Sequence, residues 1–226
     1  RQNPHGVSAV VFVPEQSQLA FHVREIQNRL EKLLPGRFQM IETLHMTIQN
    51  FESGEDEIPA DRREQAARRL HDAISNQPRF DVYFQGLNAA PRGARLFAQG
   101  YPVPRESMDP DETDALLELR KTLTDQPRPV AHIAIAVPVR PLTPKEYEQY
   151  LHLMDSFHAE PLGWLEIDTI TLAYHRSDFF DQGSFEILAE YALSAPTSDD
   201  MVILLTEVRQ QQAADVLTLE NARIYI

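Results

Sequence analysis

Two histidines lie in apolar segments whose alternation is typical of β-strands, TLHMTIQN (43–50) and PVAHIAIAV (129–137). Side chains two positions apart on a strand point to the same face, so His45 and Thr47 share one face of the first strand. In the second strand, His132 shares its face with small alanines, and the isoleucines take the other face. An imidazole beside a hydroxyl on one face indicates either a phosphate site or an ordinary solvated sheet face.

The surroundings of the two histidines repeat along the chain. The segment with His45 is followed by a charged helical segment and then by FDVYFQGL, which starts at Phe80. The segment with His132 is followed in the same way by a charged helical segment and by WLEIDTITL, which starts at Trp164. Two units predict a pair of similar lobes, because a solenoid needs at least three. We therefore expect the two histidine strands to line one shared cleft, where the alanines leave room for a ligand.

The elements that must position these residues follow from hydrophobic periodicity and from turn residues. We expect strands over 7–14, 38–51, 79–88, 94–102, 129–139, 164–176 and 184–193, and helices over 17–34, 60–77, 115–124 and 143–159. Thr143 is the expected N-cap of the last helix, with Pro144 in its first turn. The pattern after residue 195 predicts a further strand, helix and strand without indicating where they pack.

The two histidine segments resemble the motifs of the 2H phosphoesterase superfamily, which includes the bacterial 2′-5′ RNA ligase-like proteins and cyclic phosphodiesterases. Its members carry two His-x-Thr/Ser motifs on strands of two pseudo-symmetric lobes. TLHMTIQNF resembles the first motif, and PVAHIAIAV resembles the second in its apolar frame and order of elements. Ala134 departs from the pattern, because the family usually has Thr or Ser there. The departure removes one hydroxyl expected on the phosphate.

The resemblance implies an α+β fold of two pseudo-symmetric lobes, each an antiparallel sheet flanked by helices, with a central cleft. It covers roughly residues 7–194. We therefore expect residues 1–195 to form a bilobal domain and residues 196–226 to form a C-terminal extension packed on it.

The implied activity is metal-independent hydrolysis of a 2′,3′-cyclic phosphate or a 2′-5′ phosphodiester in nucleotides or short RNA, with RNA ligase-like activity as a related reaction. In this mechanism His45 and His132 are the acid–base pair and Thr47 binds the phosphate, with neither cofactor nor metal. Histidine suits both roles because its ordinary pKa is about 6.5. The sequence leaves open which histidine is the acid. The alternative is a nucleotide- or RNA-end-binding protein that lost turnover with the hydroxyl missing at Ala134.

Three consecutive residues near the end of a late strand, Tyr174, His175 and Arg176, are further candidates for ligand contact. His-Arg-Ser at 175–177 also satisfies the bare tripeptide motif. We rank it below the other two, because Ser177 opens a polar loop rather than continuing an apolar strand.

Composition limits the partners. The net charge of −13 argues against a protein that coats long nucleic acid, although a few local donors suffice for a small phosphorylated ligand. The chain has no cysteine, so disulfides and thiolate sites are excluded, and a cytoplasmic protein is expected. The N-terminal apolar run is too short to span a membrane, and no phosphate loop of the ATP-dependent enzymes is present. The oligomeric state stays open.

Overall fold

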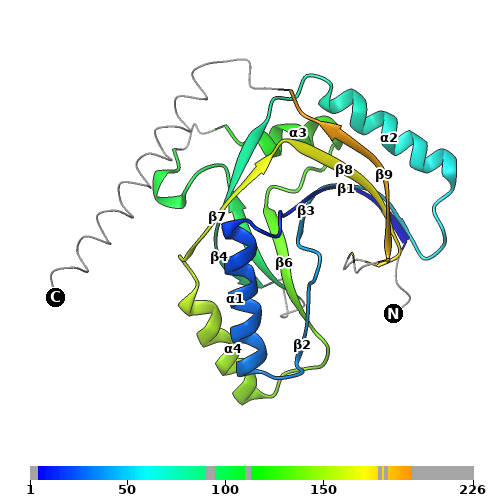
Figure 1. The fold of residues 1–226 in the computed structure, drawn as a ribbon. Helices are drawn as coiled ribbons and strands as arrows, with labels where there is room; N and C mark the ends of the chain where they lie inside the picture. Colours follow the sequence, from blue (N-terminus) through cyan, green and yellow to red (C-terminus); the bar gives the residue numbers. More distant parts are fainter. Residues whose placement is uncertain (1–4, 90–94, 110–112, 178–179, 181–182, 195–226) are drawn as a thin grey trace.

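The computed structural model describes residues 5–89, 95–109, 113–177, 180 and 183–194. They form one curled antiparallel sheet of nine strands with α-helices packed against it (Figure 1). The strand order is β7-β4-β5-β6-β3-β1-β8-β9, with β2 paired to β6. The strands are β1 (His5–Phe12), β2 (Phe38–Met40), β3 (His45–Gly54), β4 (Phe80–Ala89), β5 (Leu96–Tyr101), β6 (Ala131–Pro138), β7 (Pro161–Ile167), β8 (Thr169–His175) and β9 (Phe185–Ala192).

The sheet consists of two halves, and each half has its own pair of helices. Helix α2 contacts β1, β3, β8 and β9, and α3 packs beside it, whereas α1 and α4 lie beside the half that holds β2, β4, β6 and β7 (Figure 1). The helices are α1 (Gln18–Leu33), α2 (Ala60–Ile74), α3 (Ala115–Leu123) and α4 (Pro144–Ser156), and one 3₁₀ turn covers Arg105–Ser107. The predicted α+β fold, with antiparallel sheets flanked by helices, is confirmed.

The two half-sheets join at their inner strands, β3 and β6. Each of these strands carries one of the two motif histidines, and their ladder is recorded at a single pair, Met46 opposite Ile133. We call this junction the seam. The predicted pair of lobes is therefore one continuous sheet that turns at the seam. Residues 196–226 lie outside the described residues, so the C-terminal extension stays a prediction.

Two predicted strands are each divided in the structure. The segment 38–51 forms two strands, β2 and β3, because the chain leaves the sheet between them. The Ile41 amide, just after β2, still donates to the Ile135 carbonyl of β6. The segment 164–176 forms β7 and β8, which part at Asp168 and pair with β4 and β1 in different halves. The apolar positions change phase at Asp168, from Leu165 and Ile167 to Ile170 and Leu172, and the prediction of one continuous strand missed this break.

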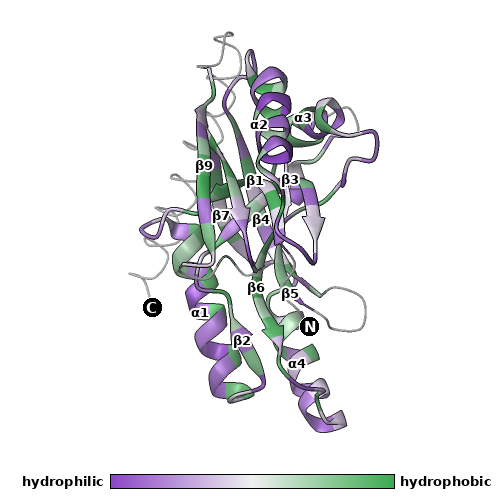
Figure 2. Ribbon diagram, turned by 90° about the vertical axis from the view of Figure 1, so that its right-hand side faces the viewer, coloured by the Kyte–Doolittle hydropathy of each residue, from purple (hydrophilic) through white to green (hydrophobic). Residues whose placement is uncertain are grey.

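The main core lies between the sheet and the helices. Leu19, Val23, Ile26 and Leu30 recur at helical spacing along α1 and are fully buried there. In Figure 2 the outer helix α2 is mostly hydrophilic, whereas β6 is mostly hydrophobic. Burying these apolar side chains supplies the main favourable free energy of folding.

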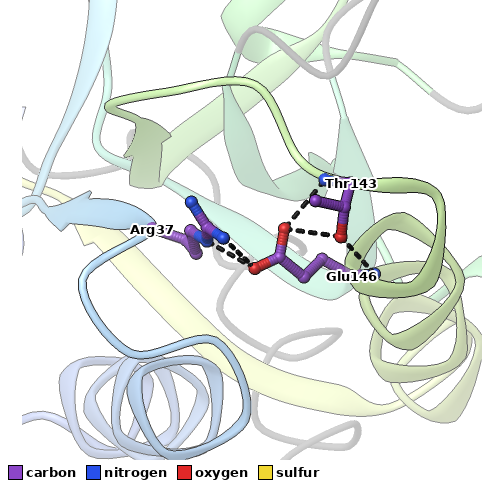
Figure 3. Close-up of polar contacts among 3 residues, drawn as sticks. All are labelled: Arg37, Thr143 and Glu146. Carbon is purple, nitrogen blue, oxygen red and sulfur yellow. Dashed lines mark hydrogen bonds and ion pairs between the residues drawn. The ribbon is translucent and has the colours of Figure 1, made fainter.

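Helix α4 begins as the sequence predicts. The Thr143 hydroxyl accepts from the Glu146 amide, and the Glu146 carboxylate accepts from the Thr143 amide at 2.8 Å, which completes a capping box (Figure 3). The same carboxylate pairs with Arg37, which follows the turn after α1. The hydrogen bonds from Thr143 and Arg37 lower the pKa of Glu146. The pair thus ties β2 and the start of α4 together.

Candidate active site

The seam brings the two sequence motifs onto one face of the sheet. Met46 and Ile133 are direct partners with fully buried side chains in the main core. Their neighbours in sequence must therefore point to the opposite face. Continuing this antiparallel register sets His45 opposite Ala134 and Thr47 opposite His132. We call this side of the sheet the histidine face.

Hydrogen bonding fixes the tautomer of His45. Its Nδ1 lies 2.9 Å from the carbonyl oxygen of Thr43, and only an N–H can bond to a carbonyl. The proton of the neutral ring therefore sits on Nδ1, and Nε2 keeps its lone pair. The ring packs against Phe180, with ring centroids 4.3 Å apart, and meets Phe12 edge-on.

Burial keeps His45 neutral at ordinary pH. His45 is 8% exposed, and this desolvation lowers its pKa from 6.5 to about 4. The bond to Thr43 raises the pKa, and the charges of Arg95, His175 and His132 lower it further. A neutral imidazole with a free Nε2 lone pair is the form that accepts a proton in catalysis.

This lowered pKa makes stability depend on pH. Below pH 6.5 His45 becomes protonated in the unfolded chain, whereas in the folded chain it stays neutral down to about pH 4. The free energy of unfolding should therefore fall between these limits, by about 3 kcal/mol for this residue, and His45 should contribute no dependence above pH 6.5. Urea unfolding at pH 7 and pH 4.5 tests this. His45→Gln should show a smaller loss than the wild type, and an equal loss in both proteins would contradict the assignment.

His132 is held in the same way as His45. It hydrogen-bonds to the backbone of Val130, two residues earlier in sequence, just as His45 bonds to Thr43. Burial lowers its pKa, and nearby arginines lower it further. The ring of Phe97 meets the imidazole edge-on at 5.4 Å. The two histidines thus repeat one local arrangement from the two sides of the seam.

A cation that the sequence analysis did not select lies beside both histidines. Arg95 immediately precedes β5, where Phe97 pairs with Ala134 and Gln99 with His132 on the histidine face. The register of β5 against β6 shifts between Leu96 and Phe97, and the electrostatic effect of Arg95 on both histidines indicates that its charge lies near the histidine face. Its charge lowers the pKa of both His45 and His132. No motif marks Arg95, because its role depends on the pairing of β5 with β6.

The three candidates at the end of β8 separate in the structure. His175 lies on the histidine face, opposite Gly6, where an added Cβ would come within 2.6 Å of its ring. Its Nε2 is 2.9 Å from the hydroxyl of Ser8, and that hydroxyl donates to the Asn50 side chain. His175 also packs against Phe180, the ring that covers His45. A third histidine therefore adjoins the predicted pair.

Tyr174 and Arg176 are placed differently. Tyr174 points to the opposite face of β8, where it is buried in the main core. Its ring lies under the guanidinium of Arg63, 3.9 Å away, and its hydroxyl bonds to His5. Arg176 is exposed just beyond β8. The geometry favours a structural role for Tyr174 over a ligand contact from the histidine face.

A pocket of about 640 Å³ opens at the segment that precedes β3, and its lining residues do not include His45, Thr47 or His132. Its walls include Thr43 and Leu44, which precede His45, and Phe12, whose ring meets the imidazole. Arg24 and Glu42 add polar groups to the lining. The volume falls in the range of pockets that hold small organic ligands.

Two features are absent from the described residues. No group of three or more histidine, aspartate or glutamate side chains there could hold a metal ion. None of the helices in those residues is long and apolar enough to cross a membrane.

Solved structures share this arrangement of strands and helices. TT0787 of Thermus thermophilus superposes with a TM-score of 0.58 at 17% identity over 84% of this chain and 98% of its own. Apo LigT of Escherichia coli gives a TM-score of 0.53 at 16% identity over 84% of this chain and 98% of LigT. The chain has the LigT fold. LigT complexed with ATP also matches, with a TM-score of 0.51 at 20% identity over 85% of this chain and 99% of LigT.

These likenesses show the fold that the resemblance of the histidine motifs to the 2H phosphoesterase superfamily predicts. No protein-family model matches the chain, and no curated protein sequence matches it either. The LigT fold thus rests on the tertiary structure, and the chemistry rests on the residues of the histidine face.

Proposed function

We propose that the chain is a metal-independent phosphoesterase of the 2H type, which hydrolyses a 2′,3′-cyclic phosphate or a 2′-5′ phosphodiester of a nucleotide or short RNA. The observation that carries the proposal is the shared face of the seam. Two histidines, each bonded to the backbone two residues earlier, lie on neighbouring strands, with Thr47 opposite His132 in the register. Neighbours of the same fold support a phosphoesterase in general terms.

His45 acts as the base and His132 as the acid in this proposal. Nε2 of His45 takes a proton from a water, whose oxygen forms the new bond to phosphorus. The bond from phosphorus to the leaving ribose oxygen breaks, and His132 gives that oxygen a proton. A bound phosphate anion raises the pKa of His132 and so supplies the protonated form that this step needs.

Thr47 and Arg95 stabilise the charge on the non-bridging oxygens. The Thr47 hydroxyl is the donor from the first motif, on the face that carries both histidines. Ala134 offers no donor from the second motif, and Arg95, near both imidazoles, supplies positive charge in its place. Fixed donors aimed at the transferring group are among the largest contributions to such catalysis.

The proposed substrate is small. The pocket that Thr43 and Leu44 line is large enough for a small organic ligand, and the solved LigT complexes hold phosphate, ATP or 3′-AMP. The acidic chain, with a net charge of −13, disfavours a long polyanion.

Hydrolysis of the four 2′,3′-cyclic nucleotides in the presence of a chelator tests the proposal. We expect product formation without added metal and a bell-shaped dependence of the rate on pH, from one group that must be neutral and one that must be protonated. A wild type that binds nucleotides without turning them over would support the alternative, a binding protein, because Ala134 lacks the hydroxyl of the second motif.

Restoring that hydroxyl gives a separate prediction. Ala134→Thr adds a donor beside the phosphate, and we expect kcat to rise roughly tenfold, less than the roughly 10²–10³-fold effect of a single oxyanion donor, because Arg95 already supplies charge there. Ala134→Val is the matched control, because it has the same shape without the hydroxyl. Equal rates for the two variants would show that Ala134 is not a phosphate contact.

A further inference from the structure

Little backbone pairing holds the seam together. Between β3 and β6 the ladder is recorded at one pair, whereas the neighbouring strands pair over most of their length. The two histidines flank this one pair, so their separation depends on whatever else fixes one strand against the other. Hydrogen bonds from helix side chains on the core side of the sheet fix β3 and β6 against each other.

Arg120 of α3 joins the two sides of the seam. It is 2% exposed, which is rare for an arginine. Its guanidinium donates to four carbonyl oxygens, two on β3 and two in the segment that leads into β6. These are the carbonyls of Ile48 at 2.9 Å, Thr47 at 2.7 Å, Arg128 at 2.8 Å and Val130 at 3.1 Å.

The burial of this cation is costly, and carbonyl dipoles offset the cost. No ion pair with Arg120 is recorded among the described residues. Burial lowers its pKa to about 10, with Asp114 opposing and Arg128 adding to the shift. The guanidinium therefore stays protonated at neutral pH and keeps all four hydrogen bonds charged. A buried charge without a carboxylate partner is hard to explain by stability alone.

The carbonyls that Arg120 binds belong to the residues that set the site. Thr47 carries the proposed phosphate hydroxyl, and the backbone of Val130 is the hydrogen-bond partner of His132. We propose that Arg120 is a positioning residue, which holds the His45–Thr47 strand and the His132 strand in the relative register that the reaction requires. This inference rests on the proposed function.

A second buried side chain links segments near the same seam and offers a matched control for Arg120. Gln27 of α1 is buried, and its amide donates to the carbonyls of Ile41 at 2.8 Å and Ile135 at 2.9 Å. It also links two segments across the sheet, but it carries no charge and touches neither Thr47 nor the partner of His132. Gln27→Leu therefore reports what the loss of a purely structural brace does.

Arg120 acts on His132 by charge as well as by position. Among the described residues, the arginines whose charges act on His132 are Arg120 from α3, Arg95 before β5 and Arg128 before β6, and His45 lies diagonally across the seam from it. Arg120 is absent from the causes of the shift at His45. Neutralising Arg120 should therefore raise the pKa of His132 and leave that of His45 in place.

The test compares Arg120→Met, Arg120→Lys, Gln27→Leu and, as the control for loss of an exposed arginine, Arg68→Met. For each protein we would measure the histidine titrations by NMR, the melting temperature, and kcat and KM on a 2′,3′-cyclic nucleotide. For Arg120→Met we expect kcat to fall about 100-fold with KM within about threefold, and the His132 midpoint to rise. Arg120→Lys should recover about tenfold in kcat and most of the His132 midpoint. Gln27→Leu should lower the melting temperature without moving the His132 midpoint.

The possible outcomes are distinct. The proposal would be overturned if both Arg120 variants had lower melting temperatures but kept the kcat and the His132 midpoint of the wild type. If Arg120→Met does not fold, Arg120→Lys decides, with a loss of about tenfold in kcat as support and none as refutation. If the wild type turns over no substrate, the proposed phosphoesterase fails by itself. A shift of His132 without one of His45 would still support the placement of Arg120.

Discussion

Replacing either seam histidine by glutamine will lower kcat for cyclic phosphate hydrolysis by roughly 10²–10⁴-fold, the usual contribution of a positioned acid or base. Glutamine keeps the approximate size and one donor of the imidazole but cannot exchange a proton near neutral pH. The loss should appear in kcat more than in KM, because the proton moves only as the bonds to phosphorus change.

The two single variants should also lose different limbs of the pH profile. His45→Gln removes the group that must be neutral, so the acid limb should disappear from the residual activity. His132→Gln removes the group that must be protonated, so the alkaline limb should disappear. The control is His152→Gln, since His152 is exposed on α4. Residual rates within tenfold of wild type in both seam variants would rule out the two-histidine mechanism.

Replacing Arg95 by methionine will lower kcat about 100-fold, comparable with the loss of one oxyanion donor. Among the described residues, Arg95 is the arginine whose charge lowers the pKa of both His45 and His132. Methionine retains much of the apolar stem and removes the charge. Both histidine midpoints should therefore rise in an NMR titration, in contrast to Arg120→Met, which should move only His132.

A double variant separates the phosphate role of Arg95 from its effect on the histidines. The proposal is that the charge of Arg95 compensates for the hydroxyl missing at Ala134. Ala134→Thr should then raise the activity by a larger factor in the Arg95→Met background than in the wild type. A double-mutant cycle measures this coupling. Arg68→Met, at an exposed position of α2, is the control. Additive effects would place Arg95 outside the phosphate site.

Some features of this chain follow from local sequence. The alternation in 43–50 and 129–137 predicts both histidine strands, and Thr143 with Pro144 predicts the start of α4. These signals are local, because a strand face and a helix cap depend on residues a few positions apart. The same local pattern placed His45, Thr47, His132 and Ala134 on the correct faces of their strands.

Other features depend on which strands become neighbours. A change of phase in the apolar positions at Asp168 marks the end of β7, but the sequence does not show that β7 and β8 pair in different halves of the sheet. Tyr174 and His175 are adjacent in sequence, but pairing with β1 turns only His175 toward the ring that covers His45. Face and neighbour are set by long-range pairing, which a single sequence does not display.

The residue types, the motif strands and the missing hydroxyl at Ala134 are visible in the unfolded chain. Only the folded structure brings β3 and β6 together and places the charge of Arg95 near both imidazoles. In the same way, only the fold lets Arg120 join the two strands from the core side of the sheet. Folding also sets the protonation of His45, because its low pKa comes from burial under rings and strands that are distant in sequence. Desolvation and charge act through space, so they exist only once the chain has folded.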